Sequence, residues 1–99
     1  MNRSKFSVDY YIKEKSTDKN TYDEYNITDK IKFDVVSSTG SLEEDDFDVF
    51  IRKSDFPEHK SPSPHDLAFF IKELKFYDVK DCQDAGDFYI INITKYKCK

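Results

Sequence analysis

Strict alternation between apolar and polar residues dominates the first half of this chain. It runs through residues 6–13 and 25–35 and returns at 47–51. A period of two residues is the signature of a β-strand with one buried and one solvated face. The second segment is interrupted on its apolar face by Asp29, where we predict a bulge or a strand end. The pattern therefore predicts three strands joined as an antiparallel meander.

The second half of the chain carries a different local signal, beginning at Ser63. Ser63 can cap a helix, Pro64 suits the first helical position, and Asp66 can reach back as in a capping box. The next apolar residues recur at i, i+3, i+4 and i+7, namely Leu67, Phe70, Ile71 and Leu74. We therefore expect one amphipathic helix from Leu67 to Leu74, which ends by about Asp78.

A turn at residues 84–87 introduces the last predicted strand, residues 88–97. Its first residues are apolar on both faces, which suits a central position in a sheet with the helix covering one side. The expected fold class is α+β, a small antiparallel sheet packed against one helix in the order strand, strand, strand, helix, strand. The 99 residues match the size of one domain, so we expect residues 1–99 to form a single unit.

Composition limits the chemistry that such a domain can perform. There are 14 lysines and only two arginines, Arg3 and Arg52, a skew that indicates an A/T-rich genome. Scarce arginine disfavours a dedicated phosphate-binding site, because bidentate hydrogen bonds to phosphate are best made by its planar guanidinium group. The two glycines stand alone, which excludes a phosphate-cradling loop or a dinucleotide fingerprint. We expect no cofactor.

Targeting and redox signals favour an intracellular protein. The first residues lack an apolar leader, and no run approaches the roughly 18 apolar residues needed to span a membrane. A straight final strand would carry Cys98 about 30 Å away from its start, whereas the residues after Cys82 can return at most about 20 Å. We therefore expect two free thiols, no membrane association, and an intracellular location.

Negative charge is concentrated in the middle of the chain. Residues 34–58 contain eight acidic and two basic residues, within a net charge of −4 for the whole chain. The densest run supplies the candidate partner-binding residues Glu43, Glu44, Asp45, Asp46 and Asp48. Such a run can attract a basic partner, for example the nucleic-acid groove of a protein that this domain blocks, or a cationic toxin. It also suits a solvated turn that keeps a sheet edge from pairing with other chains.

Other chemistries have weaker support. The acidic run lacks the ligand spacing and sixth-position glycine of a calcium-binding EF-hand. A divalent-metal-dependent nuclease would combine Asp46 or Asp48 with the triplet Glu58-His59-Lys60, but that triplet follows Pro57 in a predicted loop. His59 and His65 have no partners in a catalytic spacing. We assign no catalytic residue and no metal ligand.

Interleaved aromatic and basic residues define the main alternative. The segments Tyr10–Lys13 and Tyr96–Lys97 could stack on and neutralise a single-stranded nucleic acid, with Tyr11 and Lys97 as the residues to test. The negative total charge disfavours this reading. We therefore predict a non-enzymatic accessory, inhibitor or immunity-type protein that binds a basic protein. Single-stranded nucleic-acid binding and a metal-dependent nuclease remain as alternatives, and the oligomeric state stays open.

Overall fold

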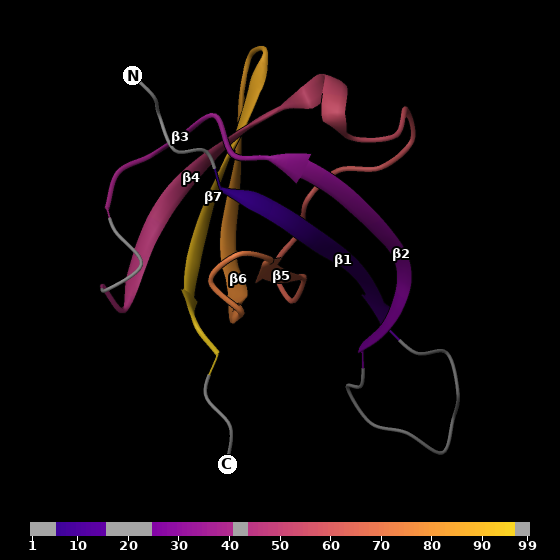
Figure 1. Ribbon diagram of the computed structural model, residues 1–99. Helices are drawn as coiled ribbons and strands as arrows, with labels where there is room; N and C mark the ends of the chain where they lie inside the picture. The colour runs from indigo at the N-terminus through magenta and orange to yellow at the C-terminus, as the bar shows by residue number, and fades with distance from the viewer. Residues whose placement is uncertain (1–5, 16–24, 41–43, 97–99) are drawn as a thin grey trace.

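The described chain forms one antiparallel sheet of seven strands (Figure 1). The computed structural model describes residues 6–15, 25–40 and 44–96. In chain order its elements are β1 Ser7–Lys15, β2 Tyr25–Asp34, β3 Ser37–Ser38, β4 Asp46–Arg52, the 3-10 turn η1 Lys53–Asp55, β5 Leu67–Phe70, β6 Lys75–Ala85 and β7 Phe88–Lys95.

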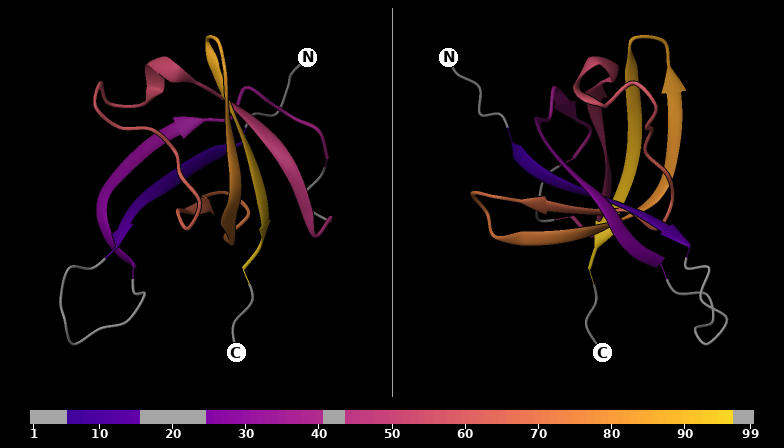
Figure 2. Two further views of the ribbon diagram at one scale, coloured as in Figure 1. Left: turned by 180° about the vertical axis from the view of Figure 1, so that it is seen from behind. Right: turned by 90° about the vertical axis from the view of Figure 1, so that its right-hand side faces the viewer.

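The sheet curls until its two ends meet. Its strand order is β2-β1-β5-β6-β7-β4-β3, so the outermost strands, β2 and β3, are consecutive in the chain. The main-chain N–H of Val35 donates to the carbonyl of Phe6 beside β1, and that of Val36 donates to the carbonyl of Phe50 in β4, both at 2.8 Å. One chain segment thus passes from one end of the sheet to the other. The strands wrap around a shared interior (Figure 2).

The core lies inside this curled sheet because each strand turns its alternate apolar residues inward. Rings fill much of it: Tyr10 lies 5.5 Å from Phe33 and 5.4 Å from Phe56, between ring centroids. Burial of each large apolar side chain stabilises the fold by roughly 1.5–3 kcal/mol. The buried apolar residues are Val8, Tyr10, Ile12, Ile31, Phe33, Val35, Phe47, Val49, Ile51, Phe56, Ala68, Phe70, Tyr77, Val79, Ile91 and Ile93.

The three alternating segments form strands as predicted, namely β1, β2 and β4. The predicted meander is wrong, because β2 pairs with β1 while β4 pairs with β7 and β3. The irregularity expected at Asp29 is present. Ile12 pairs with Asp29 and Lys13 with Ile27, so Thr28 is the extra residue of a bulge. The final turn is a two-residue loop in which Gly86 adopts a φ of 78°. Glycine adopts this backbone conformation without a steric penalty.

The predicted α+β class and the helix from Leu67 to Leu74 are wrong. Leu67–Phe70 is strand β5, residues 71–74 form a turn, and β6 begins at Lys75; the described residues contain no α-helix. Ala68 pairs with Tyr10 of β1 on one side and with Tyr77 of β6 on the other. These long-range pairings outweigh the local helical pattern. β7 does lie inside the sheet, between β6 and β4, but no helix covers it.

The predicted reach of Asp66 back to Ser63 forms without a helix. The main-chain N–H of Ser63 donates to Asp66 Oδ2 at 2.9 Å. The same carboxylate accepts the Tyr10 hydroxyl at 2.7 Å and the main-chain N–H of Lys13 at 2.9 Å. His65, at a φ of 85°, turns the chain out of a helical path. Asp66 is fully buried and joins β1 to the start of β5.

We expect Asp66→Ala to destabilise the fold by about 3 kcal/mol, because it leaves the buried Tyr10 hydroxyl and two partly buried main-chain N–H groups without their acceptor. Tyr10→Phe removes one donor and should cost about 1–2 kcal/mol. The double variant should lose less stability than the sum of the two single losses, since without the Tyr10 hydroxyl the removal of Asp66 leaves one donor fewer unpaired. Urea unfolding followed by circular dichroism measures all three. A loss below 1 kcal/mol for Asp66→Ala would contradict this role.

Burial and the Asp66 carboxylate raise the pKa of Tyr10 well above its usual range. Above about pH 10 the unfolded chain ionises this phenol while the folded chain keeps it protonated. Stability should therefore fall as pH rises, by about 1.4 kcal/mol per pH unit from this group. Urea unfolding at pH 9, 10 and 11 should show a shallower decline for Tyr10→Phe than for the wild type. Equal slopes would contradict the assignment.

Candidate functional site

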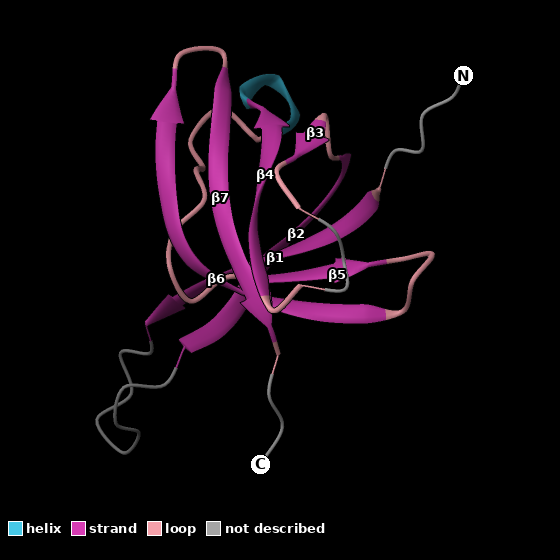
Figure 3. Cartoon of the chain, turned by 90° about the vertical axis from the view of Figure 1, so that its left-hand side faces the viewer, coloured by secondary structure: helices cyan, strands magenta, loops and turns pink. Residues whose placement is uncertain are grey.

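Strands β6, β7 and β4 lie side by side in the sheet (Figure 3). Their outer face carries four aspartates in two neighbouring cross-strand rows. The rows are Asp48–Asn92–Asp81 and Asp46–Thr94–Asp78. Strands in a sheet lie about 4.8 Å apart, so each row spans about 10 Å. We call Asp46, Asp48, Asp78 and Asp81 the acidic face.

A bulge in β6 gives Asp81 its outward position. Tyr77 and Val79 point into the core, so strict alternation would send residue 81 inward as well. The register shifts between Val79 and Asp81, which leaves Lys80 as the extra residue and pairs Asp81 with Asn92. Bulges commonly redirect a side chain in this way. The shift therefore completes the row that begins at Asp48.

Neighbouring side chains hold the acidic face in place without neutralising it. Asn92 Nδ2 donates to Asp48 Oδ1 at 2.9 Å. Lys80 Nζ lies 3.8 Å from Asp46 Oδ2, with both side chains about half exposed, so this ion pair contributes little stability. Burial raises the pKa of Asp78, and nearby Lys13 partly offsets that rise. The face keeps an excess of negative charge.

The acidic run predicted to bind a partner divides between the face and its border. Asp46 and Asp48 lie on the face. Asp45 precedes β4, where its carboxylate lies 3.8 Å from Lys95 Nζ. Glu44 is exposed and lies close to Gly40: a side chain added at Gly40 would place its Cβ 2.6 Å from Glu44 Oε1. Glu43 lies outside the described residues.

Two members of the face, Asp78 and Asp81, were missed by the sequence reasoning. The expected helix extended almost to Asp78, which hid the long strand β6. The alternation of Phe76, Asp78 and Lys80 with Tyr77 and Val79 is the signal that could have found that strand. Asp81 lies beyond the bulge, where the alternation changes phase.

A shallow hollow of about 220 Å³ lies on the face, lined by Asp48, Asp81, Cys82, Gln83, Ile90 and Asn92. The two carboxylates come from strands on either side of β7, which places their backbones about 10 Å apart. No group of three or more His, Cys, Asp or Glu side chains among the described residues could hold a metal ion. The hollow therefore suits contact with another molecule better than ligation of an ion.

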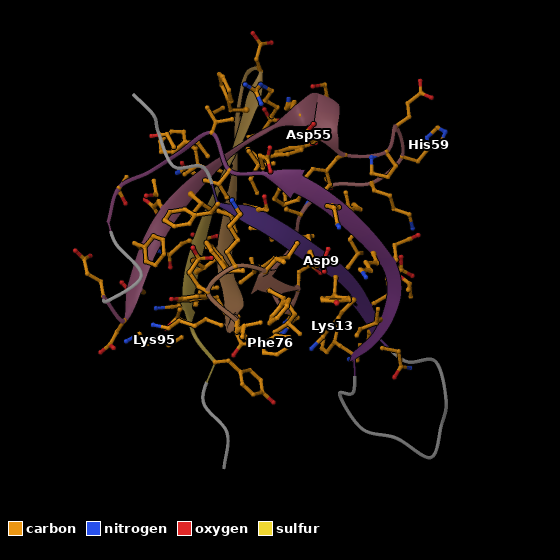
Figure 4. The ribbon with its side chains drawn as sticks, in the orientation of Figure 1. Asp9, Lys13, Asp55, His59, Phe76 and Lys95 are labelled. Atoms are coloured by element: carbon orange, nitrogen blue, oxygen red, sulfur yellow. The ribbon has the colours of Figure 1, made fainter. Side chains whose placement is uncertain are left out.

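The residues of the nuclease alternative do not come together. Asp46 pairs with Thr94 on β7. The triplet Glu58-His59-Lys60 lies on the other side, because Lys60 Nζ contacts Asp29 of β2 at 3.0 Å and Glu14 of β1 at 3.5 Å. Figure 4 shows His59 and Lys95 at opposite ends of the molecule. This arrangement gives Glu58 no role beside Asp46.

His59 and His65 are both exposed, and His65 also contacts an aromatic ring. Its imidazole stacks on the Tyr25 ring with 4.1 Å between centroids. Tyr25 and His65 line a groove with Lys13 and Asp78. Neither histidine meets a nucleophile in the contacts of the described residues.

The tyrosines of the nucleic-acid alternative differ in exposure. Tyr10 is buried and bonded to Asp66, so it cannot stack on a base. Tyr11 is half-buried, with Lys30 Nζ 5.9 Å from its ring centroid. Tyr96 is 51% exposed, and Lys97 lies outside the described residues. The sheet surface thus retains two of the three tyrosines named for this role.

Comparison with protein-family models, with curated proteins and with solved structures finds no match for this chain. Function must therefore be inferred from the chain's own surface. In the part of the chain that the structure describes, no helix has the length and apolar character to cross a membrane.

Cys82 borders the acidic face and should react slowly. Burial, together with the Asp66 and Asp81 carboxylates, raises the pKa of its thiol to about 12. The thiolate is the reactive species, so at pH 8 we expect alkylation by iodoacetamide at least ~100-fold slower in the folded chain than in urea. A Cys98→Ser variant isolates this thiol, and mass spectrometry follows the reaction. Equal rates in the folded and unfolded chains would contradict the prediction. The expected absence of a disulfide stays a prediction, because Cys98 lies outside the described residues.

Proposed function

We propose that this chain is an intracellular, non-enzymatic accessory or inhibitor protein that binds a basic protein through its acidic face. The observation that carries the proposal is the pair of aspartate rows on β4, β7 and β6. Four carboxylates in two adjacent rows, each about 10 Å long, create a local negative potential that attracts a cationic surface.

The chemistry of the face suits lysine and arginine side chains from a partner. Asp46 and Asp81 are exposed acceptors and Asp48 and Asp78 are partly exposed, while Asn92 and Thr94 between them add polar groups. The exposed pair of Lys80 and Asp46 is weak enough to be exchanged for a cation from the partner. Complementary charge mainly raises the association rate and selects among partners. A protein that acts by covering a basic surface needs both properties.

The alternative reading, in which the acids protect a sheet edge, has less support at Asp48. β4 is bonded to β7 on one side and to β3 on the other. The main-chain carbonyl of Asp48 also accepts the N–H of Thr39 at 2.9 Å. Asp48 therefore stands on a stretch of β4 that is paired on both sides, whereas Asp46 lies nearer the start of β4, beyond the residues that pair with β3. The charge of Asp48 guards no unpaired backbone, which favours a binding role.

Charge reversal tests the proposal directly. The variant Asp48→Lys with Asp81→Lys should lose at least ~10-fold in affinity for a protein captured from nuclease-treated lysate, because it replaces attraction by repulsion. The control Glu58→Lys with Asp87→Lys makes the same change in net charge at exposed positions elsewhere and should bind like the wild type. Bound protein is quantified at two salt concentrations, since screening should weaken the wild-type complex.

Circular dichroism confirms that both variants fold before binding is compared. Binding that the acidic-face variant retains in full would overturn the proposal. Recovery of nucleic acid alone would favour the single-stranded nucleic-acid alternative instead. Equal losses in the variant and its control would indicate a response to net charge without a defined site.

A further inference from the structure

Three exposed large apolar side chains gather at one end of the sheet. Leu74 lies in the β5–β6 turn, Phe76 near the start of β6 and Tyr96 just after β7, whereas exposed Ile27 lies apart from them on β2. The Phe69 and Phe76 ring centroids lie 4.5 Å apart, and those of Phe76 and Tyr96 lie 6.3 Å apart. We call Phe69, Phe76 and Tyr96 the aromatic cluster.

The aromatic cluster continues the acidic face. Phe76 and Asp78 are two residues apart on the outer side of β6, and Tyr96 follows Thr94 by two residues beyond β7. The main-chain N–H of Tyr96 donates to the carbonyl of Phe76 at 3.2 Å, so these residues sit side by side. Phe69 pairs with Phe76 on the next strand. The rings thus form the row next to Asp46–Thr94–Asp78.

A hollow of about 310 Å³ lies beside Phe76 and Tyr96, and Lys75, Tyr77 and Lys95 also line it. This is roughly the volume of ten water molecules. Lysine stems extend apolar surface while their charged ends reach solvent. The ammonium of Lys95 lies 3.8 Å from the Asp45 carboxylate, so an acidic neighbour offsets its charge.

We propose that the aromatic cluster is the apolar anchor of the same interface. It takes one aromatic or large aliphatic side chain of the basic partner, next to the lysines or arginines that bind the acidic face. This inference rests on the proposed function. Interfaces typically place aromatic anchors at a desolvated centre with charged residues around them. An exposed apolar patch bordered by polar residues marks such a site.

Charge on the neighbouring row selects this occupant over two others. A single-stranded nucleic acid stacked on the rings would bring its phosphates toward Asp46 and Asp78. A second copy of this chain would bring a net charge of −4 against the same carboxylates. A cationic protein segment gains from both the rings and the acids. The partner class is therefore a basic segment with an apolar side chain among its cations.

Two synthetic peptides separate the two contributions. Both carry four lysines and blocked ends, and they differ only in a central tryptophan or serine. Titrations followed by ¹H–¹⁵N NMR should give at least ~10-fold tighter binding for the tryptophan peptide, with the largest shifts at the amides of Phe76 and Tyr96. Phe76→Ser should remove this advantage and leave the affinity of the serine peptide unchanged. Ile27→Ser, at a residue that is 54% exposed on β2, is the matched control and should keep it.

Each result bears on one proposal or both. Equal affinities of the two peptides, both weakened by Asp48→Lys with Asp81→Lys, would overturn the anchor and leave the basic partner standing. A tryptophan preference that survives this charge reversal with undiminished affinity would overturn the proposed function. Tight binding of oligothymidylate that Phe76→Ser abolishes would replace the anchor by a nucleic-acid platform, and no binding of either peptide would overturn both proposals. Tyr96→Ser supplies the same comparison if Phe76→Ser fails to fold.

Discussion

The buried carboxylate of Asp66 is the interaction on which the closed sheet depends. A carboxylate in a protein interior is tolerated only when donors surround it, and here they come from Tyr10, Lys13 and Ser63. Two of these donors belong to β1 and the third to the loop before β5. Asp66 directly precedes β5, so its hydrogen bonds to Tyr10 and Lys13 fix where β5 begins beside β1. That pairing joins the β1–β2 pair to β6 and β7, so the sheet can close.

Closure in turn determines which residues share the outer face. In a strand the side-chain direction changes at every residue, so a single extra residue reverses all positions beyond it. The bulge at Lys80 brings Asp81 out beside Asn92 while Cys82 packs against the core. The acidic face is thus a product of pairing between β6 and β7. It joins residues of β4 to residues about 30 positions later in the chain.

Local patterns were enough to predict the strands β1, β2 and β4, the bulge near Asp29 and the turn at Gly86. They failed at residues 67–74, where Leu67, Phe70 and Ile71 fit a helix while Ala68 and Phe70 also fit the inner side of a strand. The deciding contacts, with Tyr10 and Tyr77, come from other strands and leave no local trace. The same error hid Asp78 and Asp81. Asp46 and Asp48 were found because they belong to an acidic run that is visible in the sequence itself.

Placing charges and rings on a closed sheet has a consequence for binding. The backbone of paired strands is already ordered, so a partner that docks there incurs less entropic cost than one that must order a loop. Long-range attraction to the carboxylates would set the association rate, whereas burial of a side chain among Phe69, Phe76 and Tyr96 would set the dissociation rate. Salt would then act mainly on the first rate. The carboxylates would therefore govern which partner is selected, and the neighbouring rings would govern how long it stays bound.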